Sequence, residues 1–258
     1  MKHIPHLLFQ LTIKDIALRY KGSALGFAWA ALTPLLMLTI YTIVFSAVFD
    51  AKWGVETDNR FAFAMALFCG LIIINMAIEV TNRSVVLIAS HVNYVKKVIF
   101  PLGVLPLTIT LSSFFNCIVG FLILFAAQIV LADGVYVTVL FLPIVLLPFL
   151  LIVVGFSFVF SSISVYVKDM VNFMSVVSAL LMFTSPVFFS LEDLPETVSR
   201  AFLMNPFTFV IINVRNVVFY GIGVDWTYWL ISFVTGMFLF FFGWRFFKRL
   251  RKGFADVL

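Results

Sequence analysis

The side chains that could do chemistry in this chain are few and widely separated. His3 and His6 would meet on one turn of a helix, but His91 lies far along the chain, so we predict no metal site. Glu79 stands in an apolar stretch, four residues before Arg83. That spacing favours an ion pair on one helix face over a proton relay.

Motifs that bind nucleotides or perform hydrolysis are absent from the sequence. It contains no G-x-x-x-x-G-K-S/T phosphate loop, no G-x-S-x-G turn and no H-E-x-x-H pair. We therefore expect no enzyme activity and no cofactor in this chain. A carrier driven by protons or sodium would have several ionisable groups within its spans. Glu79 is the only acidic residue well inside one, so the energy for any transport is expected from a separate polypeptide.

The elements that must position these groups are membrane spans. Of the 258 residues, 63% are hydrophobic and 11% charged, and the mean hydropathy of +1.15 lies outside the range of soluble proteins. Crossing a bilayer takes roughly 20 apolar residues. Six stretches qualify as predicted spans: 29–49, 61–80, 104–131, 137–163, 171–189 and 226–247. We predict an all-α integral membrane protein with a single permease domain over 1–258.

The segment 190–225 fails to be a span. Its best apolar run, 207–214, is much shorter than the roughly 20 residues required. Asn205-Pro206 interrupts it, because proline lacks an N–H donor and disfavours helix in the residue before it. Yet the segment is too apolar for an aqueous loop. We therefore predict a re-entrant helical pair in the outer leaflet before the last span.

The positions of basic residues predict the orientation. With the N-terminus inside and six spans, only Lys52, Arg60, Arg200 and Arg215 of the 17 Lys and Arg fall on the outer side. This asymmetry fits the positive-inside rule and predicts that both termini are cytoplasmic. The basic residues are spread over several segments and form no stripe with aromatic residues, so we predict no nucleic-acid partner.

Residues 1–28 have charges throughout and no signal-peptide core. Phe9, Ile13, Ile16 and Tyr20 recur at helical spacing, which predicts one apolar face of an amphipathic helix on the inner membrane surface. The remaining parts are spans one to five within 29–189, the re-entrant segment 190–225, and the last span with its basic tail, 226–258.

Three polar residues, Asn75, Asn116 and Gln128, stand inside predicted spans. Hydrogen bonds between helices explain such residues. The alternative is contact with a polar substrate.

The sequence resembles the permeases of polysaccharide ABC exporters, above all the transmembrane subunit of lipid-linked O-antigen exporters. The likeness begins with IKDIALRYKGSALGFAW at 13–29 and covers nearly the whole chain. Further fragments follow in the order of that family: Thr33-Pro34, Lys96-Lys97 with Pro101, Leu105-Pro106, Tyr166-Val-Lys-Asp169, Thr184-Ser-Pro186, Pro195, and Asn205-Pro206 with Arg215.

The resemblance implies two copies of this chain forming a conduit in the bacterial inner membrane. Two cytoplasmic ATP-binding subunits, with ATP and Mg²⁺ on those chains, would drive export. The substrate would be a polysaccharide on an undecaprenyl-pyrophosphate carrier, moved from the cytoplasmic to the outer side. Capsule and teichoic-acid exporters are near relatives, so the type of polysaccharide stays open.

Site residues follow from this expected topology. Tyr94, Lys96, Lys97, Lys168 and Asp169 would couple the chain to the ATPase, and Arg83, Lys96 and Lys97 would receive the carrier pyrophosphate. Tyr41, Phe45, Phe188 and Phe189 are candidates for the lining of the conduit, although most membrane aromatic residues face lipid. Asn205, Pro206 and Arg215 would form an outer gate. A scaffold without a pathway is the alternative of a different class, and a secondary transporter is disfavoured by the lack of ionisable residues in the spans.

Overall fold

A computed structural model describes residues 4–44, 60–96, 100–131, 134–188, 191 and 195–258, and in this part of the chain the secondary structure is helical. The α-helices are α1 (Ile4–Tyr20), α2 (Trp29–Ile43), α3 (Arg60–Leu87), α4 (Val92–Val95), α5 (Val104–Leu131), α6 (Leu142–Tyr166), α7 (Met170–Phe183), α8 (Glu196–Leu203), α9 (Thr208–Val218), α10 (Trp226–Leu250) and α11 (Phe254–Val257). Short 3-10 turns lie at Gly26–Ala28, Ala89–His91, Val137–Phe141 and Arg251–Gly253.

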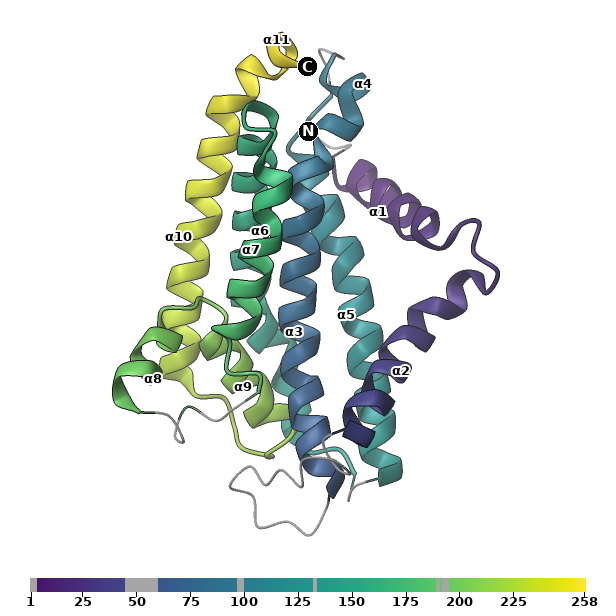
Figure 1. The fold of residues 1–258 in the computed structure, drawn as a ribbon, viewed down its shortest axis with the longest axis vertical. Coiled ribbons are helices and arrows are strands. Elements are labelled where there is room, and N and C mark those ends of the chain that lie inside the picture. Colours follow the sequence, from purple (N-terminus) through teal and green to yellow (C-terminus); the bar gives the residue numbers. More distant parts are fainter. Residues whose placement is uncertain (1–3, 45–59, 97–99, 132–133, 189–190, 192–194) are drawn as a thin grey trace.

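In the part of the chain that the structure describes, five helices are long and apolar enough to cross a membrane: Gly26–Ile43, Phe63–Leu87, Val104–Leu131, Val137–Tyr166 and Trp226–Val257. They correspond to five of the six predicted spans. The predicted span 171–189 is shorter than expected, since α7 has 14 residues and ends at Phe183. Pro186 explains the early end, because the residue before a proline avoids helical conformation. Even so, α7 runs along the same long axis as its neighbours (Figure 1).

The predicted helical pair is confirmed. α8 and α9 meet at an angle of 94°, on either side of Asn205-Pro206. Both helices lie toward the end of the molecule opposite the two termini (Figure 1). α8 has no buried residue, whereas most of α9 is buried. The pair therefore consists of one superficial helix and one helix that belongs to the core.

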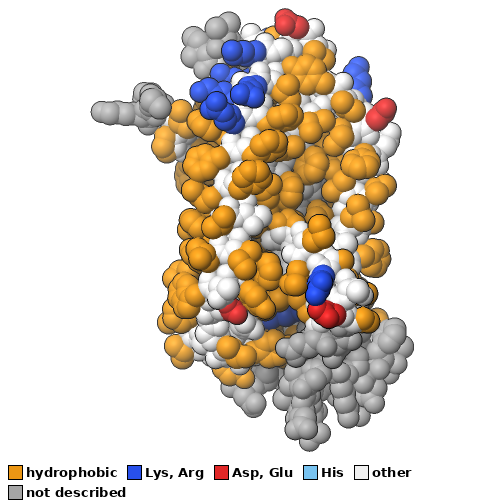
Figure 2. Space-filling view, turned by 90° about the vertical axis from the view of Figure 1, so that its left-hand side faces the viewer, with side chains coloured by type: hydrophobic (Ala, Val, Ile, Leu, Met, Phe, Trp, Pro, Cys, Tyr) orange, Lys and Arg blue, Asp and Glu red, His pale blue; other side chains and the backbone are white. Residues whose placement is uncertain are grey.

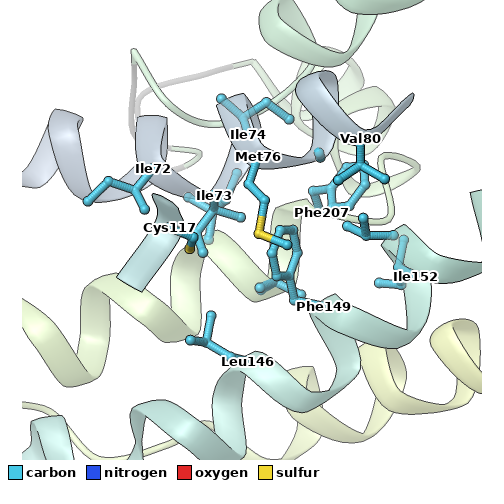
Figure 3. Close-up of a cluster of buried hydrophobic side chains, with 14 of the residues drawn as sticks. Ile72, Ile73, Ile74, Met76, Val80, Cys117, Leu146, Phe149, Ile152 and Phe207 are labelled. Atoms are coloured by element: carbon cyan, nitrogen blue, oxygen red, sulfur yellow. The ribbon is translucent and has the colours of Figure 1, made fainter. Parts of the chain in front are cut away.

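The core is built around α3, which packs against α2, α5, α6, α7 and α9. Figure 3 shows apolar side chains of α3 meeting those of α5 and α6, among them Ile73, Met76, Cys117 and Phe149, with Phe207 from just before α9. All five of these side chains are buried. Helices in lipid gain little from the hydrophobic effect, so close packing of this kind holds them together.

Glycines allow α6 and α10 to approach very closely. A Cβ atom on Gly155 would come within 2.6 Å of the Leu239 carbonyl carbon, and one on Gly236 within 2.9 Å of the Pro148 oxygen. Small residues at such positions are typical of helix contacts inside membranes.

The surface has the pattern of a membrane protein. Figure 2 shows hydrophobic side chains covering most of one face, with Lys and Arg gathered toward one end. Figure 1 places both termini and α4 at that same end. The basic end of α10, including Lys248 and Arg249, lies there too. The two termini therefore share one end of the bundle, as the predicted topology requires.

Candidate functional site

Charged side chains meet where α1 crosses α3 and α5. Arg83 Nη2 on α3 donates hydrogen bonds of 2.7 and 2.6 Å to the two carboxylate oxygens of Asp15 on α1. Arg19 on α1 forms an ion pair with Glu79 on α3. The predicted pair within α3 is also present, since Arg83 Nη1 lies 3.6 Å from Glu79 Oε1. The pairs between helices are the shorter ones, so this cluster joins α1 to the bundle.

Two serines of α5 complete the cluster. Ser113 donates to Glu79 Oε1 at 2.6 Å, and Ser112 donates to Asp15. Ser112 Oγ in turn accepts from Arg83 Nη1 at 3.0 Å. Both serines are fully buried. We call the six residues Asp15, Arg19, Glu79, Arg83, Ser112 and Ser113 the α1 junction. Two acids face two guanidinium groups, so their formal charges cancel.

Tyr20 adds a further bond between α1 and α5. Its hydroxyl donates to Asn116 Oδ1 at 2.8 Å. Burial raises the pKa of the Tyr20 phenol, Arg19 opposes this effect, and Glu79 reinforces it. The hydroxyl therefore stays protonated and remains a donor at neutral pH. Asn116 is thus used as predicted, in a hydrogen bond between helices.

The four residues predicted to form the apolar face of the N-terminal helix differ in exposure, and their contact with the inner membrane surface stays a prediction. Ile16 and Tyr20 are half-buried against the protein, but Phe9 and Ile13 are exposed at 64% and 50%. The side that meets the bundle is the one bearing Asp15 and Arg19. Polar partners on α3 and α5 explain this orientation, because a nearby opposite charge stabilises an ionised group.

The described residues predicted to receive a pyrophosphate differ in how accessible they are. Arg83 already holds Asp15 and Glu79, and Lys96 is exposed just after α4. Lys97 lies outside the described residues. Binding of the carrier by these residues remains a prediction, with Lys96 the most accessible of the described pair.

The described residues among those predicted to couple to an ATPase, which are Tyr94, Lys96, Lys168 and Asp169, lie at the end of the bundle that holds the termini. Tyr94 stacks between His91 and Phe100, with ring centroids 5.6 and 4.4 Å away. Lys168 and Asp169 are exposed in the tight turn between α6 and α7. Tyr166, the last residue of α6, connects this turn to the end of α10, because its hydroxyl donates to the Leu250 carbonyl at 2.8 Å.

The candidates for lining a conduit are described only in part. Tyr41 is half-buried on α2, and Phe188 is half-buried beyond the end of α7. Both pack against the hydrophobic core. Phe45 and Phe189 lie outside the described residues.

The outer residues Asn205, Pro206 and Arg215 fasten the bent pair to the end of α7. Asn205 Nδ2 donates to Thr184 Oγ1 and Ser185 Oγ at 2.9 and 3.0 Å, and its Oδ1 accepts from the Phe207 amide. Pro206 lies between α8 and α9, at the bend itself. Thr184 and Ser185 directly follow α7. The hydrogen bonds of Asn205 therefore attach the bend between α8 and α9 to the end of α7.

Arg215 is buried, with 4% exposure, and binds three carbonyl oxygens. Its Nε donates to Ala66 at 3.1 Å, and its Nη1 and Nη2 donate to Pro186 at 2.5 Å and Val187 at 2.7 Å. A planar guanidinium can bind several acceptors at once. Arg215 therefore joins α9 to α3 and to the segment that follows α7. The carbonyls of Pro186 and Val187 lie shortly after the end of α7 at Phe183.

Sequence reasoning missed the roles of Asp15, Arg19, Ser112 and Ser113. One signal was available on α3, where Asn75, Glu79 and Asn82 recur at intervals of four and three residues on one face. Such a polar stripe in an apolar helix predicts polar partners on its neighbours. The identity of those partners required the tertiary structure.

Taken together, an apolar helical bundle with a superficial N-terminal helix and a bent outer pair defines a multi-pass integral membrane protein of the permease type. A model of the family described as ABC-2 type transporter matches residues 6–219. The chain belongs to the ABC-2 type transporter family.

Individual proteins similar to this chain have related names. Two proteins of Klebsiella pneumoniae, each named O-antigen export system permease protein RfbA, are both 26% identical to it, over 257 and 254 residues. Each alignment covers 98% of this chain and 95% of the relative. A protein of the same name from Myxococcus xanthus is 23% identical over 198 residues, covering 77% of this chain and 74% of its own length.

Proposed function

We propose that this chain is the transmembrane subunit of an ATP-driven exporter of O-antigen polysaccharide. The observation that carries the proposal is the similarity to O-antigen export permeases along 98% of the chain. The substrate would be linked to undecaprenyl pyrophosphate and would move from the cytoplasmic to the outer side of the bacterial inner membrane. Capsule or teichoic-acid export is the alternative within this class.

The partners would be a second copy of the chain and two cytoplasmic ATP-binding subunits that hold ATP and Mg²⁺. α2 and α7 support the second copy, since both expose rows of large apolar side chains. These are Leu35, Leu36, Met37, Ile40 and Ile43 on α2, and Val171, Phe173, Val176, Leu180 and Phe183 on α7. Such faces must meet either lipid or another protein, and a conduit needs two facing walls.

Coupling to the ATPase would use the exposed turn with Lys168 and Asp169 together with Tyr94, Lys96 and Lys97. The described members of this set lie at one end of the bundle, beside the basic end of α10. The carrier pyrophosphate would approach the same end. Exposed Lys96 offers it a free ammonium group, whereas Arg83 would have to exchange a carboxylate for a phosphate.

At the opposite end, the bent pair would close the conduit. The buried contacts of α9, including the three bonds of Arg215, favour α9 as the fixed part. α8 has no buried residue. It would be the part that moves, with Asn205-Pro206 as the hinge. Tyr41, Phe45, Phe188 and Phe189 would line the path below it.

The experiment is deletion of the gene in its native host, followed by complementation. Loss of long-chain polysaccharide from the cell surface, with lipid-linked polysaccharide accumulating inside, is the expected result. Purification of the tagged chain should bring down an ATP-binding protein. A deletion strain with unchanged lipopolysaccharide, capsule and wall polymers would favour the alternative of a scaffold without a pathway.

A further inference from the structure

Asn75 is an exception in α3, the most deeply buried of the candidate spans among the described residues. From Phe63 to Ala77, every residue of α3 is buried except Asn75, which is exposed. The position is near the middle of a helix that is apolar enough to span a membrane. Its amide makes no hydrogen bond within the described part of the chain. An amide left without a partner at this depth is costly, so it needs water or a polar ligand.

The reason for its exposure is a cavity of about 320 Å³ between α1, α2, α3 and α5. Asn75, Asn116, Glu79 and Arg19 form its polar side. Trp29 and Pro34, with Met37, Phe68 and Ile72, contribute the apolar side. One wall is α2. It belongs to the least buried of the candidate spans, in which only 11% of the residues are buried. The cavity therefore has hydrogen-bonding groups on one side and an apolar wall with aromatic rings on the other.

The charges around the cavity favour an uncharged occupant. Arg19 and Glu79 bind each other, and Ser113 also donates to Glu79. No net charge is left to attract a phosphate. The two amides instead offer both donors and acceptors. Asn75 has its whole amide available, while Asn116 uses Oδ1 for Tyr20 and keeps its N–H groups.

We propose that this cavity binds a sugar ring of the transported polysaccharide, with Asn75 and Asn116 contacting its hydroxyl groups and Trp29 facing its C–H surface. Neighbouring hydroxyls require paired donors and acceptors, which amides supply. An aromatic ring beside them provides the flat apolar contact that the other face of a sugar needs. This inference rests on the proposed function, and it adds a binding site on α3 and α5 to the aromatic residues predicted for the conduit.

The direct test is the reactivity of a cysteine at position 75. In a background with Cys69→Ala and Cys117→Ala, Asn75→Cys and the fully buried neighbour Ile74→Cys are prepared in nanodiscs together with the ATPase partner. A charged methanethiosulfonate should modify Asn75→Cys at least about tenfold faster than Ile74→Cys, since only a hydrated thiolate reacts. Delipidated polysaccharide from the producing strain should then slow that reaction several-fold.

Each other outcome overturns the assignment. Equal, slow reaction at positions 74 and 75 would mean a dry cavity. Rapid reaction that the polysaccharide does not slow would mean a cavity filled with water alone. Rapid reaction in detergent that becomes slow in nanodiscs without polysaccharide would mean that a lipid occupies the cavity.

Export measurements separate this inference from the proposed function. Asn75→Leu should lower the rate of polysaccharide export several-fold while the ATPase partner still co-purifies. Asn82→Leu is the matched control, because Asn82 lies on the same polar stripe of α3 but outside the cavity and bonds Ser178 at 3.0 Å. If gene deletion abolishes export but Asn75→Leu exports like Asn82→Leu, the sugar site is wrong and the proposed function stands. If gene deletion changes no surface polysaccharide, the proposed function itself fails.

Discussion

Arg83 and Asp15 lie 68 positions apart in the sequence, yet one guanidinium nitrogen of Arg83 binds both carboxylate oxygens of Asp15. This contact is the centre of the α1 junction. It connects the superficial N-terminal helix to α3, the helix around which the core is built. Together with the Tyr20–Asn116 bond, these side chains would transmit a displacement of α1 to α3 and α5.

The Asp15–Arg83 pair predicts rescue by charge exchange. Asp15→Arg and Arg83→Asp should each destabilise the protein by about 1–2 kcal/mol, since charged hydrogen bonds are lost at a site that is still about a quarter exposed. The double exchange should recover a large part of that loss. Thermal unfolding in detergent measures all three variants. If the double variant loses as much stability as the two single variants lose together, the pair is not coupled.

Arg215 should be essential for the stability of the outer end. Arg215→Leu leaves the Pro186 and Val187 carbonyls without this donor. Each unsatisfied buried group should lower the free energy of unfolding by about 1–3 kcal/mol. Arg215→Lys keeps the charge but cannot bind three carbonyls in one plane, so it should fall between wild type and Arg215→Leu. Arg200→Leu is the control, because Arg200 is 75% exposed in a surface ion pair. Equal melting temperatures for the variants at 200 and 215 would contradict this role.

The contact between α6 and α10 should not tolerate a side chain. Gly155→Leu would drive side-chain atoms into the backbone of α10 at Leu239, which must then move away. We expect loss of folded protein, measured as the monodisperse fraction in size-exclusion chromatography. Gly223→Ala should behave like wild type, because a Cβ there meets no atom within 4 Å. A well-folded Gly155→Leu protein would mean that the two helices can separate without cost.

The orientation of the chain predicts labelling from opposite sides of the membrane. Met204, 85% exposed between α8 and α9, should react as Met204→Cys with an impermeant thiol reagent added to intact spheroplasts. Lys252→Cys, in the exposed basic tail, should react only after the membrane is opened. Labelling of both positions from outside would overturn the prediction that the termini are cytoplasmic.

Charge reversal at the exposed turn between α6 and α7 should weaken coupling to the ATPase. Asp169→Arg removes an acidic group from the surface predicted to meet that partner, so less ATPase should co-purify and stimulated hydrolysis should fall several-fold. The protein should insert normally, because Asp169 is exposed. Glu196→Arg, a change at another exposed acid that lies at the opposite end of the bundle, is the control. Identical ATPase binding by both variants would remove 169 from the coupling surface.

Much of the fold could be predicted from local sequence features. Apolar stretches longer than the bilayer core predicted the long helices, and Asn205-Pro206 predicted the bend between α8 and α9. The i,i+4 pair of Glu79 and Arg83 was also foreseeable, since both residues lie on one helix. In each case the cause lies within one segment, so neighbouring residues are enough to reveal it.

The tertiary structure alone decided which groups face one another. Sequence spacing did not single out Asp15 and Arg19 on α1, yet these two residues face the bundle because Glu79, Arg83 and two serines lie opposite them. The exposure of Asn75 likewise depends on how α2 stands away from α3 and α5. A polar group within an apolar helix has the same local sequence whether its partner is a side chain, a carbonyl or a cavity. Only the packing of distant segments selects among these, because it alone sets the distances on which electrostatic and hydrogen-bond energies depend.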